Sequence, residues 1–349
     1  MTNFDFRIPL LGSLLLAGSP LAAQAADPIV MNISCYSGAY AAAFKQYVIP
    51  QFEKDHNVKI VYSEASSEPT LTKLQAQKAS PQIDLACVSS GISAKAKKLG
   101  LLEKNDPAIV TNAAKLRAYA KDKDDIGIAW GTLAMGISYD PEQYKNAGLE
   151  PPKSWNDLLN PKNEGHLSFS DFTGTYGPFT LIMMAKANGG SQGDIDPGFK
   201  AMADMSKLAV TIAGTDFTQL YSQKEIWVAP WANSDVSTVV KKTGLPLEFV
   251  FPTEGSPAII TNMAVVKNAP NPELAQEFLN YMLSPEVQAI IANDFNVAPT
   301  VDGLDLPKDL ANKVGYSEEY SKRLMALDYD KLAADLPAWT QRWLAEVQK

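Results

Sequence analysis

Strand-like and helix-like segments alternate along residues 29–99, and this alternation limits the fold more than any other feature of the chain. Apolar runs at 29–36, 58–62 and 83–88 are typical of strands, whereas 41–54, 70–78 and 93–99 have the character of helices. Alternation of this kind predicts an α/β protein with a mainly parallel sheet flanked by helices. Ligands of such sheets bind beyond the carboxyl ends of the strands.

A long extended run at 126–139 carries three glycines, which favours a bent strand that crosses between two domains. The turn at 252–257 supplies a return crossing. A length of 349 residues also fits about two domains. We therefore expect a first lobe formed by 26–136 and 256–349, a second lobe formed by 137–255, and a hinged ligand cleft between them.

The N-terminus predicts export. Arg7 precedes a short apolar run, and Ala23-Gln24-Ala25 matches a signal-peptidase site. We expect a cleaved signal peptide at 1–25 and a periplasmic protein. The run is too short to span a bilayer, so we do not expect a membrane-embedded protein.

Composition excludes several function classes. The chain is 46% hydrophobic and 20% charged, which is ordinary globular composition, and its net charge of −8 with no basic face argues against nucleic acid as a partner. The two histidines, His56 and His166, lie far apart and belong to no catalytic or metal motif. We expect no catalytic residues, no metal, no cofactor and a monomeric protein.

The two cysteines, Cys35 and Cys87, lie in the first and third predicted strands. If those strands are neighbours, the two residues lie close together. Export permits a disulfide, and buried free thiols packed as small apolar groups are the alternative.

Aromatic and hydroxyl-bearing side chains gather at the predicted strand ends. They are Tyr36, Ser37, Tyr40, Ser89, Ser90, Trp130 and Trp231. Such residues can enclose an apolar or cationic ligand, although core packing is the usual role of tryptophan and tyrosine.

A glycine-bearing turn, Thr173-Gly174-Thr175-Tyr176-Gly177, opens the predicted helix that follows it. Free N–H groups at a helix start can hold an anion or a carboxylate. The alternative is that Asp171 or Thr173 only caps the helix.

Four segments, at 52–62, 81–85, 152–158 and 278–288, resemble the extracellular solute-binding proteins of bacterial ABC importers, in the branch with polyamine- and ferric-iron-binding members. The resemblance implies a type II periplasmic-binding-protein fold with two lobes. It also implies a small-molecule solute and a membrane permease as partners, with no reaction catalysed.

The resemblance further suggests ligand residues. Trp231 and Asp235 match a tryptophan and an aspartate that cage an ammonium group, and Tyr36 and Ser37 match a ligand loop. Gly38 and Asn262 stand where the polyamine binders carry acids. A polyamine or another small amine is the leading ligand. An anionic or zwitterionic solute such as an amino acid or phosphonate is second, held at 174–177, and ferric iron is third. An exported enzyme is the alternative from another class.

Overall fold

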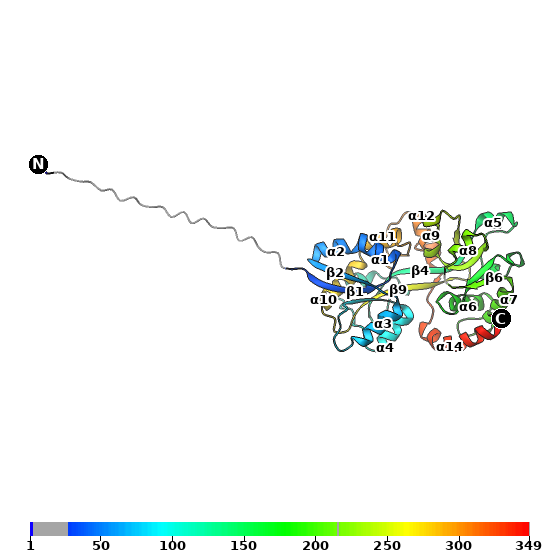
Figure 1. The fold of residues 1–349 in the computed structure, drawn as a ribbon, viewed down its shortest axis with the longest axis horizontal. Coiled ribbons are helices and arrows are strands. Elements are labelled where there is room, and N and C mark those ends of the chain that lie inside the picture. The colour runs from blue at the N-terminus through cyan, green and yellow to red at the C-terminus, as the bar shows by residue number, and fades with distance from the viewer. Residues whose placement is uncertain (3–26, 215, 349) are drawn as a thin grey trace.

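The computed structural model describes residues 1–2, 27–214 and 216–348, and it has an α/β fold with two halves joined by long shared strands (Figure 1). The predicted signal peptide at 1–25 lies almost entirely outside the described residues. The α/β prediction is confirmed: the strand order is β2-β1-β3-β9-β4-β7-β5-β6, with β10 beside β9 and β8 beside β4.

The first part of the chain follows the predicted alternation closely. Its elements are β1 (Ile29–Cys35), α1 (Ala39–Ala43), the π-helical turn η1 (Phe44–Val48), α2 (Ile49–His56), β2 (Val58–Glu64), α3 (Ser67–Ala76), β3 (Leu85–Ser89), α4 (Ser90–Lys98), the 3-10 turns η2 (Thr111–Lys115) and η3 (Ala118–Ala120), and β4 (Ile128–Tyr139).

The middle and end of the chain add a second set of strands and most of the helices. These are α5 (Pro141–Asn146), η4 (Trp155–Leu159), η5 (Pro161–Asn163), β5 (Leu167–Ser170), α6 (Tyr176–Ala187), α7 (Asp196–Leu208), β6 (Ala209–Ala213), α8 (Thr218–Ser222), β7 (Val228–Ala232), α9 (Asn233–Thr243), β8 (Glu248–Val250), β9 (Ser256–Val265), α10 (Pro272–Met282), α11 (Pro285–Asp294), α12 (Lys308–Val314), α13 (Glu318–Ser321), β10 (Leu324–Met325) and α14 (Tyr329–Glu346).

The sheet is mixed rather than mainly parallel. Pairing is parallel between β1 and both β2 and β3, and between β5 and both β6 and β7. By contrast, β9 runs antiparallel to β3 and β4, and β4 runs antiparallel to β7. The local strand–helix pattern could not reveal this reversal, because β9 is contributed by the far end of the chain.

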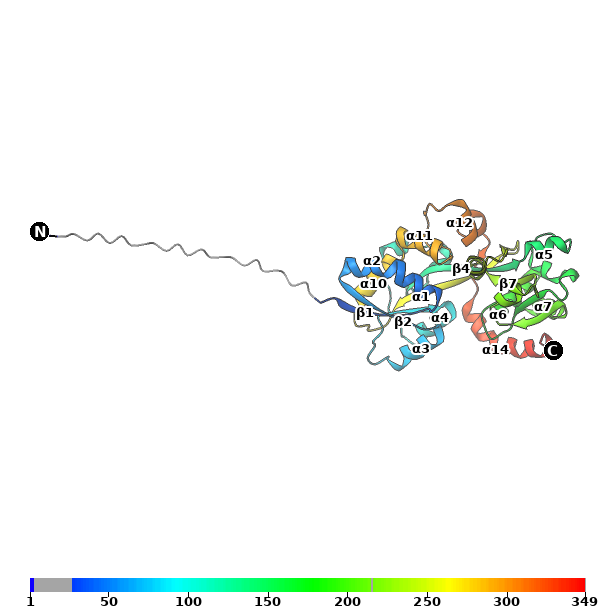
Figure 2. The same cartoon turned by 45° about the horizontal axis from the view of Figure 1, so that its top comes forward.

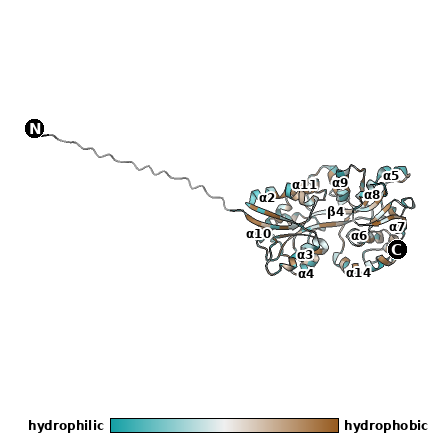
Figure 3. Ribbon diagram, viewed as in Figure 1, coloured by the Kyte–Doolittle hydropathy of each residue, from teal (hydrophilic) through white to brown (hydrophobic). Residues whose placement is uncertain are grey.

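Strand β4 crosses between the halves, as the glycine-rich run predicted. Its residues up to Ala134 pair with β9, and those from Met135 onward pair with β7. A side chain at Gly136 would meet the carbonyl oxygen of Val250 at 2.3 Å, so only glycine allows β8 to pack this closely. All twelve residues of β4 are buried, and the apolar colour of the strand contrasts with the more polar helices around it (Figure 3).

The C-terminal helix departs from the expected assignment of 256–349 to the first lobe. Trp339 and Trp343 are buried in a core with Phe169, and Trp343 stacks on Phe172 at 4.5 Å between ring centroids. Helix α14 therefore ends against the second half of the molecule (Figure 2). Its start still touches the first half, where Lys98 pairs with Asp330.

The predicted proximity of the cysteines is confirmed. Their Cα atoms lie 4.6 Å apart on neighbouring strands β1 and β3, and the two sulfur atoms are bonded. Both residues are fully buried. Of the two alternatives, the structure has the disulfide.

Candidate functional site

Polar residues at the carboxyl ends of β1 and β3 form one continuous rim. Tyr36 follows β1 and Ser89 ends β3, and the first residue of α3, Ser67, joins them. The backbone N–H of Ser89 donates to the Ser67 hydroxyl at 3.0 Å, and the Tyr36 side chain lies near the same serine. Burial raises the pKa of Tyr36 above its ordinary value, so the phenol remains a neutral hydrogen-bonding group.

The opposite half contributes a tyrosine and an aspartate that lie far apart in sequence. The hydroxyl of Tyr176, the first residue of α6, donates to Oδ2 of Asp235 in α9 at 2.5 Å. Tyr176 packs against the cores of both halves, which places it at their junction. From the first half, Tyr40 in α1 lies near Asp235, and burial together with the Asp235 charge raises the pKa of its phenol. The Ser234 hydroxyl next to Asp235 is buried without a hydrogen-bond partner among the described residues.

Asp235 has an unusual electrostatic environment. Burial raises the pKa of its carboxyl group from 3.8 to about 6; the Tyr176 hydrogen bond acts in the opposite direction, and the charge of Asp216 adds to the rise. Among the described residues, no basic side chain pairs with Asp235 or shifts its pKa. At neutral pH the carboxylate is thus ionised, largely shielded from water and without a counter-ion from this part of the protein.

A cavity of about 320 Å³ lies near the other end of the rim, beside Ser90 and Asn262. Asn262 donates to the Ser90 hydroxyl at 3.2 Å, and Tyr329 donates to the Ala258 carbonyl at 2.9 Å. A cavity of this size falls in the range of small-molecule pockets. Ser90, the residue after Ser89, thus lines a cavity next to the polar rim.

Trp130 and Trp231, which the sequence offered as ligand residues, are both buried in the core. Trp130 is 0% exposed and lies under Tyr40, with ring centroids 6.0 Å apart. Trp231 is 2% exposed and packs against Phe217 and Tyr221. Trp231 therefore does not face a cleft as expected, because its strand turns this side chain into the local core. It supports the site from beneath, since Tyr176 packs on the same core.

The glycine-bearing turn is held by Asp171. Its Oδ1 atom accepts from the backbone N–H and the hydroxyl of Thr173, at 2.9 and 2.5 Å. A side chain at Gly177 would meet the Asp171 carbonyl oxygen at 2.0 Å, so the close approach requires glycine. Within this turn Thr175 is exposed and Gly174 is partly exposed. Helix α6 begins at Tyr176 without a side-chain cap.

The structure thus brings together five expected residues: Tyr36, Tyr40, Ser89, Tyr176 and Asp235. Ser90 and Asn262 lie together at the 320 Å³ cavity, whereas Ser37 and Gly38 are exposed. Sequence reasoning missed Ser67, Ser234 and Tyr329. Ser234 adjoins Asp235 in sequence and could have been found, but the other two carry no local signal.

Across the described residues, no group of three or more His, Cys, Asp or Glu side chains could hold a metal ion. Over the same part of the chain, no helix has the length and apolar character needed to cross a membrane.

Sequence comparison finds relatives of this chain among known proteins. The chain is 25% identical over 290 residues to the spermidine/putrescine-binding periplasmic protein of Escherichia coli, covering 80% of this chain and 81% of that protein. It is 27% identical over 363 residues to a putrescine-binding periplasmic protein of Pseudomonas aeruginosa, covering 95% and 94%.

The fold also matches solved structures. An ABC transporter structure from Clostridium perfringens aligns with a TM-score of 0.78 at 24% identity, covering 91% of this chain and 99% of that one. This match confirms the two-lobed binding-protein architecture. The family model for bacterial extracellular solute-binding proteins matches residues 80–335, which is most of the chain. The protein belongs to the bacterial extracellular solute-binding protein family.

Proposed function

We propose that this protein is the receptor of an ABC importer and that it captures a small organic amine, with a polyamine as the leading candidate. The observation that carries this proposal is Asp235, a shielded carboxylate with no basic partner among the described residues. A shielded charge is costly unless it is paired, and a ligand ammonium group would supply the missing charge. The names of the two polyamine-binding relatives point to the same chemistry.

The groups around Asp235 suit an ammonium ligand. Tyr40 and Tyr176 offer aromatic rings next to the carboxylate, and such rings attract cations. Both phenols have raised pKa values, so they stay protonated and compete with the ligand for the Asp235 carboxylate only as neutral hydrogen-bond donors. We infer binding without turnover, because these groups supply no activated nucleophile or general base pair.

A zwitterionic solute is the second candidate. Gly38 and Asn262 are neutral. The acids that line the cavity beside Asn262 are already engaged, Asp122 with Lys97, Asp330 with Lys98 and Asp328 with a backbone N–H. Ser90 and Asn262 instead offer hydrogen bonds to a neutral or anionic end. A molecule with one amine and one carboxylate would therefore also satisfy the site.

We further propose that the protein acts in the periplasm after export. The Ala23-Gln24-Ala25 site supports cleavage, and mass spectrometry of protein from an intact host should find a mature N-terminus at Ala26. Recovery of the full-length chain from the cytoplasm alone would contradict this proposal.

The ligand test is titration calorimetry of the wild type with putrescine, spermidine, 4-aminobutyrate and ferric citrate. We expect an amine to bind, and Asp235→Asn to weaken that binding about 10- to 100-fold, as loss of a charge-assisted hydrogen bond implies. The matched control is Asp216→Asn, because Asp216 is an exposed neighbouring acid whose carboxylate accepts from the backbone N–H of Thr218. Binding of ferric citrate alone, or equal amine affinity in the wild type and Asp235→Asn, would refute the amine proposal.

A further inference from the structure

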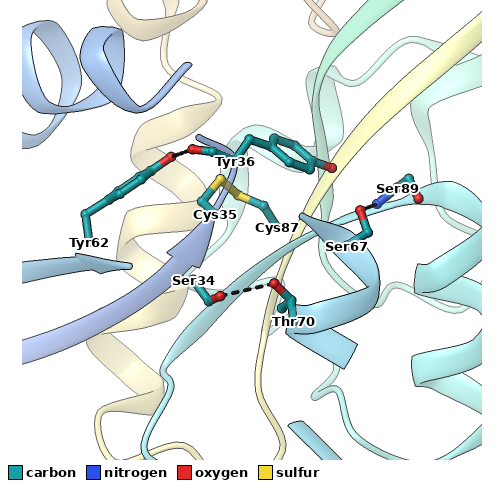
Figure 4. Close-up of a disulfide and its surroundings, with 8 residues drawn as sticks. All are labelled: Ser34, Cys35, Tyr36, Tyr62, Ser67, Thr70, Cys87 and Ser89. Carbon is teal, nitrogen blue, oxygen red and sulfur yellow. Dashed lines mark hydrogen bonds between the residues drawn. A yellow bond between two sulfur atoms is a disulfide. The ribbon is translucent and has the colours of Figure 1, made fainter. Parts of the chain in front are cut away.

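The Cys35–Cys87 disulfide lies where the pairing of β1 and β3 stops. Their parallel register runs through Ile33–Leu85 and Ser34–Ala86, so the cysteines occupy the next position along both strands. On the other side of β1, pairing with β2 continues to Cys35 itself. The bond therefore joins two strands at the point where backbone hydrogen bonds no longer do (Figure 4).

The residues just beyond the bond belong to the candidate site. Tyr36 directly follows Cys35, and Ser89 lies two residues after Cys87. The Tyr36 ring extends from the disulfide toward Ser67 and Ser89 (Figure 4). Ser67 lies between these two strand ends: its hydroxyl accepts from the backbone N–H of Ser89, and the Tyr36 side chain lies near it. The disulfide is thus the direct bond between these two strand ends, one residue beyond their last paired position.

We propose that the Cys35–Cys87 disulfide is a positioning element of the ligand site, holding the Tyr36 and Ser89 strand ends at the spacing that the solute requires. This inference rests on the proposed function, because it treats the rim as the ligand-binding surface. Without the bond, the two strand ends must be ordered when the solute binds, and this ordering lowers the affinity. Because both cysteines are fully buried, the bond is also protected from reagents in solution.

The first experiment removes the bond by mutation. The double variant Cys35→Ala, Cys87→Ala avoids placing unpaired hydroxyls in the core. Its control is Leu279→Ala, a fully buried residue of α10 in the same core, which lowers stability without touching the rim. Well below both melting temperatures, we expect the cysteine variant to bind the amine about tenfold more weakly than wild type, because immobilising flexible groups opposes binding. We expect the Leu279→Ala variant to stay within about twofold of wild type.

A double-mutant comparison distinguishes a positioning role of the disulfide from a general loss of stability. Tyr36→Phe is made with and without the disulfide. If the bond positions Tyr36, the loss of its hydroxyl weakens binding more in the bonded protein, so the two effects are not additive. Strictly additive effects would overturn the proposal, as would wild-type affinity in the cysteine variant or an equal loss in Leu279→Ala.

A third arm uses the unmutated sequence, which keeps the core packing. Protein is unfolded, reduced and refolded with or without oxidised glutathione. In the oxidised sample, the two thiols give two electrons and two protons to glutathione disulfide, which becomes two glutathione thiols. We expect weaker amine binding in the reduced sample, and equal binding would contradict the inference.

Amide exchange distinguishes failure of this inference from failure of the proposed function. The backbone N–H of Ser89 is protected by Ser67, and its exchange needs no ligand to be measured. We expect faster exchange at Ser89 in the cysteine variant than in Leu279→Ala. If no amine binds the wild type yet this difference appears, the proposed ligand is wrong and the positioning role stands. If an amine binds and the difference is absent, only the positioning role is wrong.

Discussion

Asp235→Asn should have opposite effects on the free and the ligand-bound protein. In the free protein the substitution removes a shielded charge while keeping an acceptor for the Tyr176 hydroxyl. In the complex it removes the group that pairs with the ammonium. We therefore expect a more stable free protein that no longer responds to the amine.

The magnitude follows from the pKa of Asp235, which burial raises from 3.8 to about 6. One pKa unit corresponds to about 1.4 kcal/mol, so the full shift sets an upper bound of about 3 kcal/mol. Because a part of Asp235 stays exposed, water screens some of its charge, and we expect about 1–2 kcal/mol. Since the folded-state pKa is raised, the ionised carboxylate destabilises the fold above pH 6, and this cost disappears as the pH falls toward 3.8.

Differential scanning fluorimetry at pH 7.5, with and without putrescine, measures both effects. Without ligand, Asp235→Asn should melt about 1–3 °C above wild type. With saturating ligand, the wild type should gain melting temperature by mass action, whereas the variant should gain little. The control Asp216→Asn should retain the ligand response.

An alternative role for Asp235 predicts that Asp235→Asn lowers the stability of the free protein instead of raising it. Asp235 lies in the first turn of α9, where a negative charge interacts favourably with the helix dipole. If that were its main role, Asp235→Asn would lower the free energy of unfolding by about 0.3–1 kcal/mol. A lower melting temperature of the free variant together with an unchanged ligand response would therefore refute our account.

Three further predictions concern pH, the crossing strand β4 and the core. Amine affinity should fall about tenfold between pH 7 and pH 5, because protonation of Asp235 removes the anion, and calorimetry on Asp235→Asn should show no such fall. Asn233→Ala should lower the free energy of unfolding, measured in urea, by about 1–3 kcal/mol. The buried Asn233 side chain accepts from the N–H of Ala134 on β4 and donates to carbonyls of α12, and the variant loses these bonds. An unchanged urea midpoint would contradict this prediction. Because Trp231 is a core residue, Trp231→Ala should destabilise the fold by about 3–5 kcal/mol. Trp231→Phe should keep the amine affinity within about threefold of wild type. A tenfold loss of affinity in Trp231→Phe would show that Trp231 contacts the solute directly.

Local sequence patterns determined much of the secondary structure of this protein. Apolar runs and helical spacing predicted β1, α2, β2, α3 and β3, and the glycine-rich run predicted the crossing strand β4. These predictions succeed because periodicity and turn chemistry act over a few residues. The predicted neighbourhood of Cys35 and Cys87 followed from the same reasoning, since parallel strands place their carboxyl ends together.

The tertiary structure alone decided how distant segments meet. It inserted β9 antiparallel between β3 and β4, packed Trp343 of the last helix against Phe172, and turned Trp231 into a core. Sequence spacing carries no information about such contacts, because they depend on which surfaces remain to be buried after the local elements form. The same holds for the electrostatics of the site. The sequence marked Asp235 as a candidate, but its raised pKa and its bond to Tyr176, 59 residues away, arise only when the fold shields that carboxylate from water.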